Sequence, residues 1–346
     1  MMKKRLTLFH YKSPLFFLWG DSNVAFIKKT GLFLFAVFLS VQIIAAQTNW
    51  KVSRGKGTGD LVAVFFTSAD KGWIAGDNGY LAWTGDGGRN WTKQDIGTTE
   101  SINEIYFRND DNGYLVAGKK MFVTRDAGRS WQEIKIYKPG EIRGGSPEFL
   151  SIRFADKKRG IVIGSVLNAQ ERVVDSLVMR TEDGGETWQR IIVPSKKELY
   201  HLDFVGSSKC WIVGDDGLVL ASNNGGASFQ TQRSGVALDL YNVDFRDESE
   251  GYIVGSKGTI LRTENGGATW ETIKTAFPVT FMRVDFADDK NGVIVGYEGT
   301  ILRSTDKGKS WVKQVSDTKE NLYGLYFTKK YGWAVGANGV VIQNQR

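Results

Sequence analysis

Residues 181–188 read TEDGGETW, and variants of this eight-residue phrase recur along most of the chain. The variants begin at positions 84, 124, 222, 263 and 304, and every copy ends in an aromatic residue. The closing aromatic residues are Trp91, Trp131, Trp188, Phe229, Trp270 and Trp311. Their spacings are 40, 57, 41, 41 and 41 residues. A catalytic site is built once, so a phrase that occurs six times indicates repeated architecture.

The sequence between the phrases repeats as well, as residues 241–270 and 282–311 show when they are compared. The first of these units contains four short apolar and β-branched runs, YNVDF, GYIVG, GTILRT and WETIK, separated by Gly, Asp and Asn. Such runs are typical of strands joined by turns. Four short strands in about 41 residues make one blade of a β-propeller.

The two ends of the chain together supply one more blade. Trp50 lies 41 residues before Trp91 and matches the end of a phrase, with one strand after it. Residues 321–346 supply three strands and stop where a phrase would begin. We therefore predict an all-β fold, a seven-bladed β-propeller of four-stranded blades, closed by a composite blade from both termini. Residues 47–346 would form this single domain, and closure would leave no free sheet edge.

The phrase itself is best explained as a turn between the third and fourth strands. Paired glycines such as Gly184 and Gly185 supply positive φ angles without a clash. The third residue accepts hydrogen bonds from turn amides, and the closing aromatic residue packs against a neighbouring blade. The third residues are Asp86, Asp126, Asp183, Asn224, Asn265 and Asp306. Because two copies carry Asn, we expect a structural role and no catalysis by these side chains.

Residues 1–46 resemble a targeting segment. Lys28 and Lys29 precede an apolar stretch of about fifteen residues that ends in Ala45 and Ala46. This order predicts a secretory signal peptide cleaved near Ala46, or a segment that remains as a membrane anchor. The apolar stretch is shorter than the roughly 20 residues of a membrane-spanning helix. The protein is therefore expected to be exported to the periplasm or the extracellular space.

The net charge and the scarcity of cysteine and histidine reduce the number of possible functions. The net charge is +7, but residues 1–46 hold six basic side chains and one acidic side chain. The remainder has 39 basic and 37 acidic residues, so no nucleic-acid partner is expected. Cys210 is the only cysteine and His201 the only histidine after the leader. We expect a core thiol and a strand residue there, with no metal site and no cofactor.

The pattern Ser/Thr-x-Asp-x-Gly-x-Thr-Trp resembles the Asp box, or bacterial neuraminidase repeat, of propeller proteins. The longer units GYIVGSKGTILRTENGGATW (251–270) and GVIVGYEGTILRSTDKGKSW (292–311) look like the photosystem II stability and assembly factors. This resemblance covers residues 48–346. It implies an exported seven-bladed propeller that binds a protein without catalysis and assists the assembly of a membrane complex.

Two other functions are compatible with an Asp box: a sialidase-like glycoside hydrolase and a carbohydrate-binding propeller. A sialidase would need an arginine triad, a Tyr–Glu pair and a further acidic group. The Phe/Tyr-Arg-Ile-Pro stretch that tends to precede the first box of sialidases is absent here. We therefore favour a non-enzymatic protein-binding scaffold.

Three arginines share one position in the repeat, directly before the phrase. One reading is a basic patch that binds a partner; the other is local ion pairing with aspartates of the first strand. The arginines are Arg180, Arg262 and Arg303, and the aspartates are Asp203, Asp244 and Asp285.

The third repeat is longer than the others, with extra residues in 137–147 and in 166–176. Both additions should emerge on the propeller face opposite the phrases. Long loops on a rigid scaffold commonly bind partners, although a tolerated surface insertion is the alternative. The predicted partner contacts in these segments are Lys138, Glu141, Arg143, Glu171 and Arg172.

Overall fold

The computed structural model describes residues 50–55 and 59–345. The chain divides into two units, Met1–Ala46 and Gln47–Arg346, and the described residues belong to the second. The predicted signal peptide or anchor lies outside the described residues and stays a prediction. Within the described ranges, no helix is long and apolar enough to cross a membrane.

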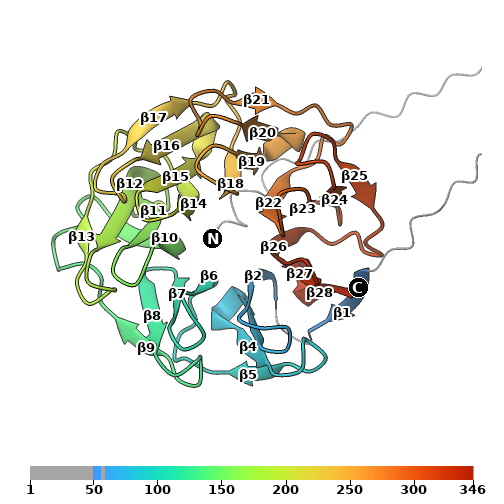
Figure 1. Ribbon diagram of the computed structural model, residues 1–346. Coiled ribbons are helices and arrows are strands. Elements are labelled where there is room, and N and C mark those ends of the chain that lie inside the picture. The colour runs from blue at the N-terminus through green and yellow to red at the C-terminus, as the bar shows by residue number, and fades with distance from the viewer. Residues whose placement is uncertain (1–49, 56–58, 346) are drawn as a thin grey trace, which may run out of the picture. The chain divides into compact units, whose positions relative to one another are not determined.

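The second unit is built from seven four-stranded antiparallel sheets arranged around a common centre (Figure 1). Blades one to three consist of β2 (Leu61–Phe66), β3 (Gly72–Gly76), β4 (Leu81–Thr84) and β5 (Thr92–Gln94); β6 (Ile102–Phe107), β7 (Gly113–Ala117), β8 (Lys120–Thr124) and β9 (Gln132–Ile134); and β10 (Ser146–Phe154), β11 (Gly160–Leu167), β12 (Val173–Thr181) and β13 (Gln189–Arg190).

Blades four to six follow the same order from the centre outward. They consist of β14 (Leu199–Val205), β15 (Lys209–Gly214), β16 (Leu218–Ser222) and β17 (Gln230–Arg233); β18 (Leu240–Phe245), β19 (Gly251–Gly255), β20 (Ile260–Thr263) and β21 (Glu271–Thr272); and β22 (Phe281–Phe286), β23 (Gly292–Gly296), β24 (Ile301–Ser304) and β25 (Val312–Gln314). Short 3-10 turns η1 to η4 lie between second and third strands, at Asp77–Gly79, Asp215–Gly217, Ser256–Gly258 and Ala337–Gly339.

Both ends of the described chain form the seventh blade. Its strands are β26 (Leu322–Phe327), β27 (Tyr331–Gly336), β28 (Val340–Gln345) and β1 (Trp50–Arg54). β1 pairs antiparallel with β28, from Trp50 opposite Asn344 to Arg54 opposite Val340. The predicted seven-bladed propeller and its composite blade are therefore confirmed.

Neighbouring blades are held together by a repeated group of three side chains. Each first strand carries a Phe at or next to its end, and in five blades its ring stacks on an aromatic side chain from the second strand of the preceding blade. In blade five, the rings of Phe245 and Trp211 are 3.5 Å apart, and the box residue Trp270 meets Phe245 edge-on at 5.8 Å. The same arrangement joins Trp73 to Phe107 and Tyr252 to Phe286. Offset and edge-on ring contacts of this kind add to the free energy of burial.

This packing explains a glycine at the start of most second strands. A Cβ atom on Gly251 would lie 2.5 Å from the ring of Phe245, so only glycine leaves room for that ring. The core beside blade four departs from this pattern. Cys210 takes the place of the glycine, Ile161 takes the place of the aromatic residue on the second strand of the preceding blade, and Phe229 takes the place of the box tryptophan. Cys210 is fully buried in this core, as expected.

The order of the strands assigns the turns to two faces. In an antiparallel sheet, turns alternate between the two ends of the strands. The phrases, hereafter the boxes, therefore share one face with the turns between first and second strands. The turns between second and third strands and the connections between blades lie on the opposite face, where the two long segments of blade three were predicted.

Candidate functional site

Each box is closed by hydrogen bonds around its third residue. In the box 181–188, the Thr181 hydroxyl donates to Asp183 Oδ1 at 2.8 Å and accepts from the Gly185 amide at 2.9 Å. Asp183 also accepts from the amide of Thr187 at 2.9 Å and from its hydroxyl. These donors lower the pKa of Asp183 to about 2. Asn224 makes the equivalent bonds to Ser222 and Ser228, so a charge is not required.

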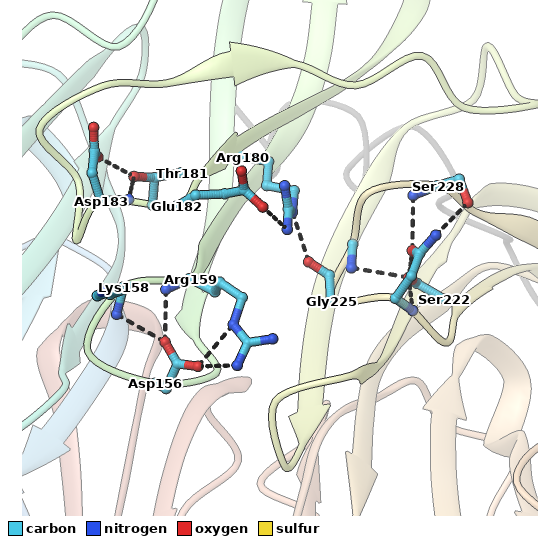
Figure 2. Close-up of polar contacts among 12 residues, drawn as sticks. Asp156, Lys158, Arg159, Arg180, Thr181, Glu182, Asp183, Ser222, Gly225 and Ser228 are labelled. Atoms are coloured by element: carbon cyan, nitrogen blue, oxygen red, sulfur yellow. Dashed lines mark hydrogen bonds and ion pairs between the residues drawn. The ribbon is translucent and has the colours of Figure 1, made fainter.

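Each box also accepts a hydrogen bond from the preceding blade through a backbone carbonyl. Arg180 Nε of blade three donates to the Gly225 carbonyl of the next box at 2.7 Å (Figure 2). The other box carbonyls receive side chains in the same way: Gly87 from Gln343, Gly128 from Gln94, Gly184 from Tyr114, Gly266 from Gln232, and Lys307 from Tyr252. The boxes thus stabilise the turn and connect consecutive blades.

The three arginines before the boxes do not form one exposed patch. The side chain of Arg180 is 5% exposed and pairs with Glu182 at 2.7 Å (Figure 2). Arg262 is 7% exposed, pairs with Glu264 and donates from Nε to the Tyr252 hydroxyl at 3.2 Å. Arg303 is half-buried and donates to Asn291 at 3.5 Å. All three guanidinium groups therefore contact other residues of the fold.

The alternative reading, ion pairs with first-strand aspartates, does not hold for Arg180 and Arg262, whose ion pairs are with glutamates. Tyr252 lies between Asp244 and Arg262 in the sheet, opposite both residues. The intervening Tyr252 accepts the hydrogen bond from Arg262 Nε. Asp203 and Asp285 instead accept the amides of Phe245 and Phe327 in the next blade, at 2.8 and 2.9 Å. The partners were misjudged because the intervening strand was ignored.

The two long segments of blade three lie side by side on the face opposite the boxes. Part of each segment extends β10, β11 or β12, so that Ser146 pairs with Leu167 and Leu167 with Val173. The chain at Gly145 runs so close to β11 that a Cβ atom there would lie 2.0 Å from the Leu167 carbonyl oxygen. We call residues 137–147 and 166–176 the blade-three lip.

The lip presents basic side chains from two ordered turns. Glu141 closes the first turn by accepting the Lys138 amide at 2.8 Å, and Asn168 closes the second by accepting the Arg172 amide at 3.0 Å. Lys138, Arg143 and Arg172 are exposed. None of these three forms an ion pair with another described residue. Their cationic groups are thus available to a partner.

A second candidate site is the central channel, a cavity of about 220 Å³ lined by residues from all seven innermost strands. The third position of the regular innermost strand differs in every blade, and its residue lines the cavity in all blades except blade three. It is occupied by Ala63, Glu104, Ser151, His201, Asn242, Arg283 and Gly324. Sequence reasoning missed this site, although the loss of repetition at one strand position was a visible signal.

One wall of the channel carries a charged network. Arg153 Nη1 pairs with Glu104 Oε1 at 2.5 Å, and its Nη2 lies 2.9 Å from His201 Nε2. Because arginine only donates, Nε2 must accept, so His201 is neutral. Burial lowers the pKa of His201 well below its usual value, and the charges of Arg153 and Arg283 lower it further. His201 is a strand residue, as expected, and its environment argues against a role as a base.

Three carboxyl groups line the next part of the channel. Burial raises the pKa of Asp203 to about 6 and that of Asp285 to about 7. Asp244, between them, has its pKa raised well above the usual range by burial and by repulsion from Asp285 and Asp203. Each carboxyl group accepts a hydrogen bond from a backbone amide of the next innermost strand, so the three groups help to join neighbouring blades. No group of His, Cys, Asp and Glu in the described ranges is arranged to hold a metal ion.

These features define the protein as a closed seven-bladed β-propeller whose boxes join consecutive blades. Residues 228–313 and 278–345 match the sequence profile of the family described as Photosynthesis system II assembly factor YCF48. The resemblance that the repeat units suggested is therefore confirmed. Residues 79–200 match a second profile, described as Sortilin, neurotensin receptor 3. No curated protein matches the chain.

Solved structures share the fold at low sequence identity. A structure described as YCF48 bound to D1 peptide is 20% identical, with a TM-score of 0.71 over 87% of this chain and 96% of that chain. YCF48 from Cyanidioschyzon merolae is 18% identical, with a TM-score of 0.68 over 86% and 98%. Virginiamycin B lyase from Staphylococcus aureus is 11% identical, with a TM-score of 0.68 over 85% and 98%. Because a lyase is among them, the fold alone does not decide the function.

Proposed function

We propose that the protein is a non-catalytic scaffold that binds a protein partner through the blade-three lip. As an exported member of the photosystem II assembly-factor type, it would assist the assembly of a membrane complex. The observation that carries the proposal is the lip itself, an ordered extension of one blade with three basic side chains that lack an ion pair among the described residues. The similar YCF48 structure with D1 peptide supports a peptide-like partner for this type of propeller.

The lip is held rigidly enough to act as a binding surface. Its strands continue the sheet of blade three, and Ile142 packs against the core between blades two and three, which fixes the basic turns on a rigid base. A preformed surface loses little conformational entropy on binding. Exposed cations mainly raise the association rate and make it depend on salt. An acidic segment of a partner protein is the matching chemistry.

The carboxyl groups of the propeller support a role without catalysis. The box aspartates are held by turn amides, and the channel aspartates by amides of neighbouring strands. The glycoside hydrolase and carbohydrate-binding alternatives rest on the box alone, and in this structure the box binds its own chain. A glycosidase needs two carboxyl groups free to act on a substrate.

Affinity capture from the protein's own cell envelope tests the proposal. The wild-type chain should retain a membrane protein reproducibly. A variant with Lys138→Gln, Arg143→Gln and Arg172→Gln should bind that partner at least tenfold more weakly, with the largest loss at low salt. The matched control removes the same charge from the box face, through Arg129→Gln, Lys157→Gln and Lys158→Gln. Both variants should melt within a few degrees of the wild type, because all six side chains are exposed.

Two results would refute the proposal. If the captured material is glycan instead of protein, the carbohydrate-binding alternative is correct. If the lip variant retains the partner as well as the box-face control does, the binding surface lies elsewhere on the propeller.

A further inference from the structure

The channel arginines have different surroundings. Arg153 is satisfied by Glu104 and His201. Arg283, in contrast, donates one hydrogen bond, from Nη1 to the carbonyl of its neighbour Met282 at 2.9 Å. None of the ion pairs among the described residues includes Arg283, and Glu104 acts on it only as a more distant charge. The Arg283 side chain is half-buried, and an arginine stays charged in such a setting. Arg283 therefore retains unused donors inside a cavity.

The two ring positions that follow Arg283 carry small residues without charge. Around the ring at the third strand position, Gly324 and Ala63 separate Arg283 from Glu104. A Cβ atom on Gly324 would lie 2.7 Å from Val335 and 2.8 Å from the Val62 carbonyl oxygen, so this position cannot carry a larger side chain without rearrangement. Gly324 is thus packed against its neighbours, and neither it nor Ala63 offers Arg283 a partner.

An aromatic wall forms the adjacent surface of the cavity. The rings of Tyr326 and Phe65 are 5.3 Å apart, and those of Phe65 and Tyr106 are 5.9 Å apart. All three residues line the same cavity as Arg283. A ligand placed here would have a guanidinium group at one end and three contacting rings along its body.

The volume limits the size of the ligand. The cavity measures about 220 Å³. A cavity of about 150 Å³ holds benzene, whereas pockets for drug-sized ligands measure roughly 300–1,000 Å³. The occupant is accordingly a compact group somewhat larger than a benzene ring, and a folded peptide segment is too large.

We propose that the central channel binds a compact carboxylate with an apolar body, its carboxylate paired with Arg283 and its body against Phe65, Tyr106 and Tyr326. Arg283 offers the planar set of N–H donors that carboxylates accept in pairs. The carboxylate belongs either to a free small acid or to one side chain of a bound protein. This site is independent of the blade-three lip, so either proposal can fail alone.

A ¹⁹F NMR titration of the full-length chain tests the site, with 4-fluorobenzoate as the probe and neutral 4-fluorobenzamide as its matched control. We expect saturable binding of the benzoate and at least tenfold weaker binding of the benzamide. Arg283→Met should weaken benzoate binding at least tenfold, and Arg283→Lys should restore part of it. Arg125→Met, on the box face, should leave the affinity unchanged.

The two sources of the carboxylate are separated by a second probe, N-acetylglutamic acid amide, whose only carboxylate is in its side chain. Tighter binding of 4-fluorobenzoate supports a free small acid, and tighter binding of the capped glutamate supports a side chain of a partner. The proposal is overturned if the wild-type chain binds benzoate and benzamide equally, or if Arg283→Met binds benzoate like the wild type. The first of these results needs no variant and is decisive even if Arg283→Met does not fold.

Discussion

The boxes and the central channel come from the same repeat but differ in how uniformly they use it. Six boxes repeat one set of hydrogen bonds, whether the third residue is Asp183 or Asn224. In the channel, each innermost strand brings a different side chain to the same level, from Ala63 to Arg283. Uniform positions hold blades together, because every blade meets the same neighbour. Positions that vary are where recognition is to be sought, although Glu104 and Asn242 also accept amides of the next blade.

The largest effect should follow removal of the strand that closes the ring. Deleting residues 50–54 exposes β28 as a free edge and removes Trp50, which is 5% exposed, from the core between blades six and seven. We expect the melting temperature to fall by roughly 10 °C or more. Lys51→Ala, at an exposed site in the same strand, is the control and should melt like the wild type. Equal melting curves for the deletion and the control would contradict closure by this strand.

Substitution of a box tryptophan should show that the boxes contribute more to stability than the channel does. Trp270→Ala removes a large side chain packed on Phe245 and should cost about 3–5 kcal/mol of the free energy of unfolding. Trp270→Phe should cost much less, since Phe229 occupies this place in blade four. Arg283→Met in the channel should change stability by less than about 1 kcal/mol. Denaturant titration measures the free energy of unfolding of all three variants. An equal loss for Trp270→Ala and Arg283→Met would show that the two regions contribute equally to stability.

The channel carboxyl groups should make stability depend on pH. The pKa values of Asp203 and Asp285 in the folded protein, about 6 and about 7, lie above their ordinary value of 3.8. These two groups therefore contribute stability that is fully present below about pH 4 and is lost as the pH rises through 7. Asp244→Asn should relieve repulsion and add on the order of 1–2 kcal/mol at pH 8, with little gain at pH 4.

Urea unfolding at pH 4, 6 and 8 measures this effect. Asp183→Asn is a control of opposite sign, because the pKa of Asp183 is lowered to about 2. Its contribution is present above the ordinary pKa and is lost only as the pH falls toward 2. If Asp244→Asn is no more stable than the wild type at pH 8, repulsion among the channel aspartates does not destabilise the folded protein.

The smallest effect should come from a single box residue. Asp183 is exposed, so water replaces part of its hydrogen bonding when it is removed. Asp183→Ala should cost about 1 kcal/mol, and Asp183→Asn less than half of that, because Asn224 and Asn265 make the same bonds. Thermal melting distinguishes them. A larger loss for Asn than for Ala would show that the charge, and not the hydrogen bonds, holds the turn.

The fold was predictable because its signals are local and repeated. The spacing from Trp50 to Trp91 identified the composite blade, and the glycines of each box identified the turns. The extra residues 137–147 and 166–176 were correctly assigned to one face, since antiparallel strands alternate their turns. They were expected as loops, whereas part of their length continues the strands of blade three.

The site residues were less predictable because their partners come from other blades. Arg180 was assigned to a patch or a local pair, but its acceptor is Gly225 of the following box. The residues next to Arg283 in the sequence do not indicate its role, because its surroundings depend on Gly324 and Ala63 in two further blades. Periodicity within one repeat cannot report such contacts. Comparison of one strand position across all blades does reveal where they vary.

The composite blade also determines when the protein can finish folding. β1 and β28 pair across a separation of 288 residues, as the bond from the Ser53 hydroxyl to the Val341 carbonyl shows. During synthesis from the N-terminus, six blades emerge before β28 exists, and β1 must wait as an unpaired strand throughout. Closing so long a loop is slow, and the waiting edge is prone to pair with other chains. Cellular yield should therefore depend on chaperone protection of this strand more than on the stability of the finished ring.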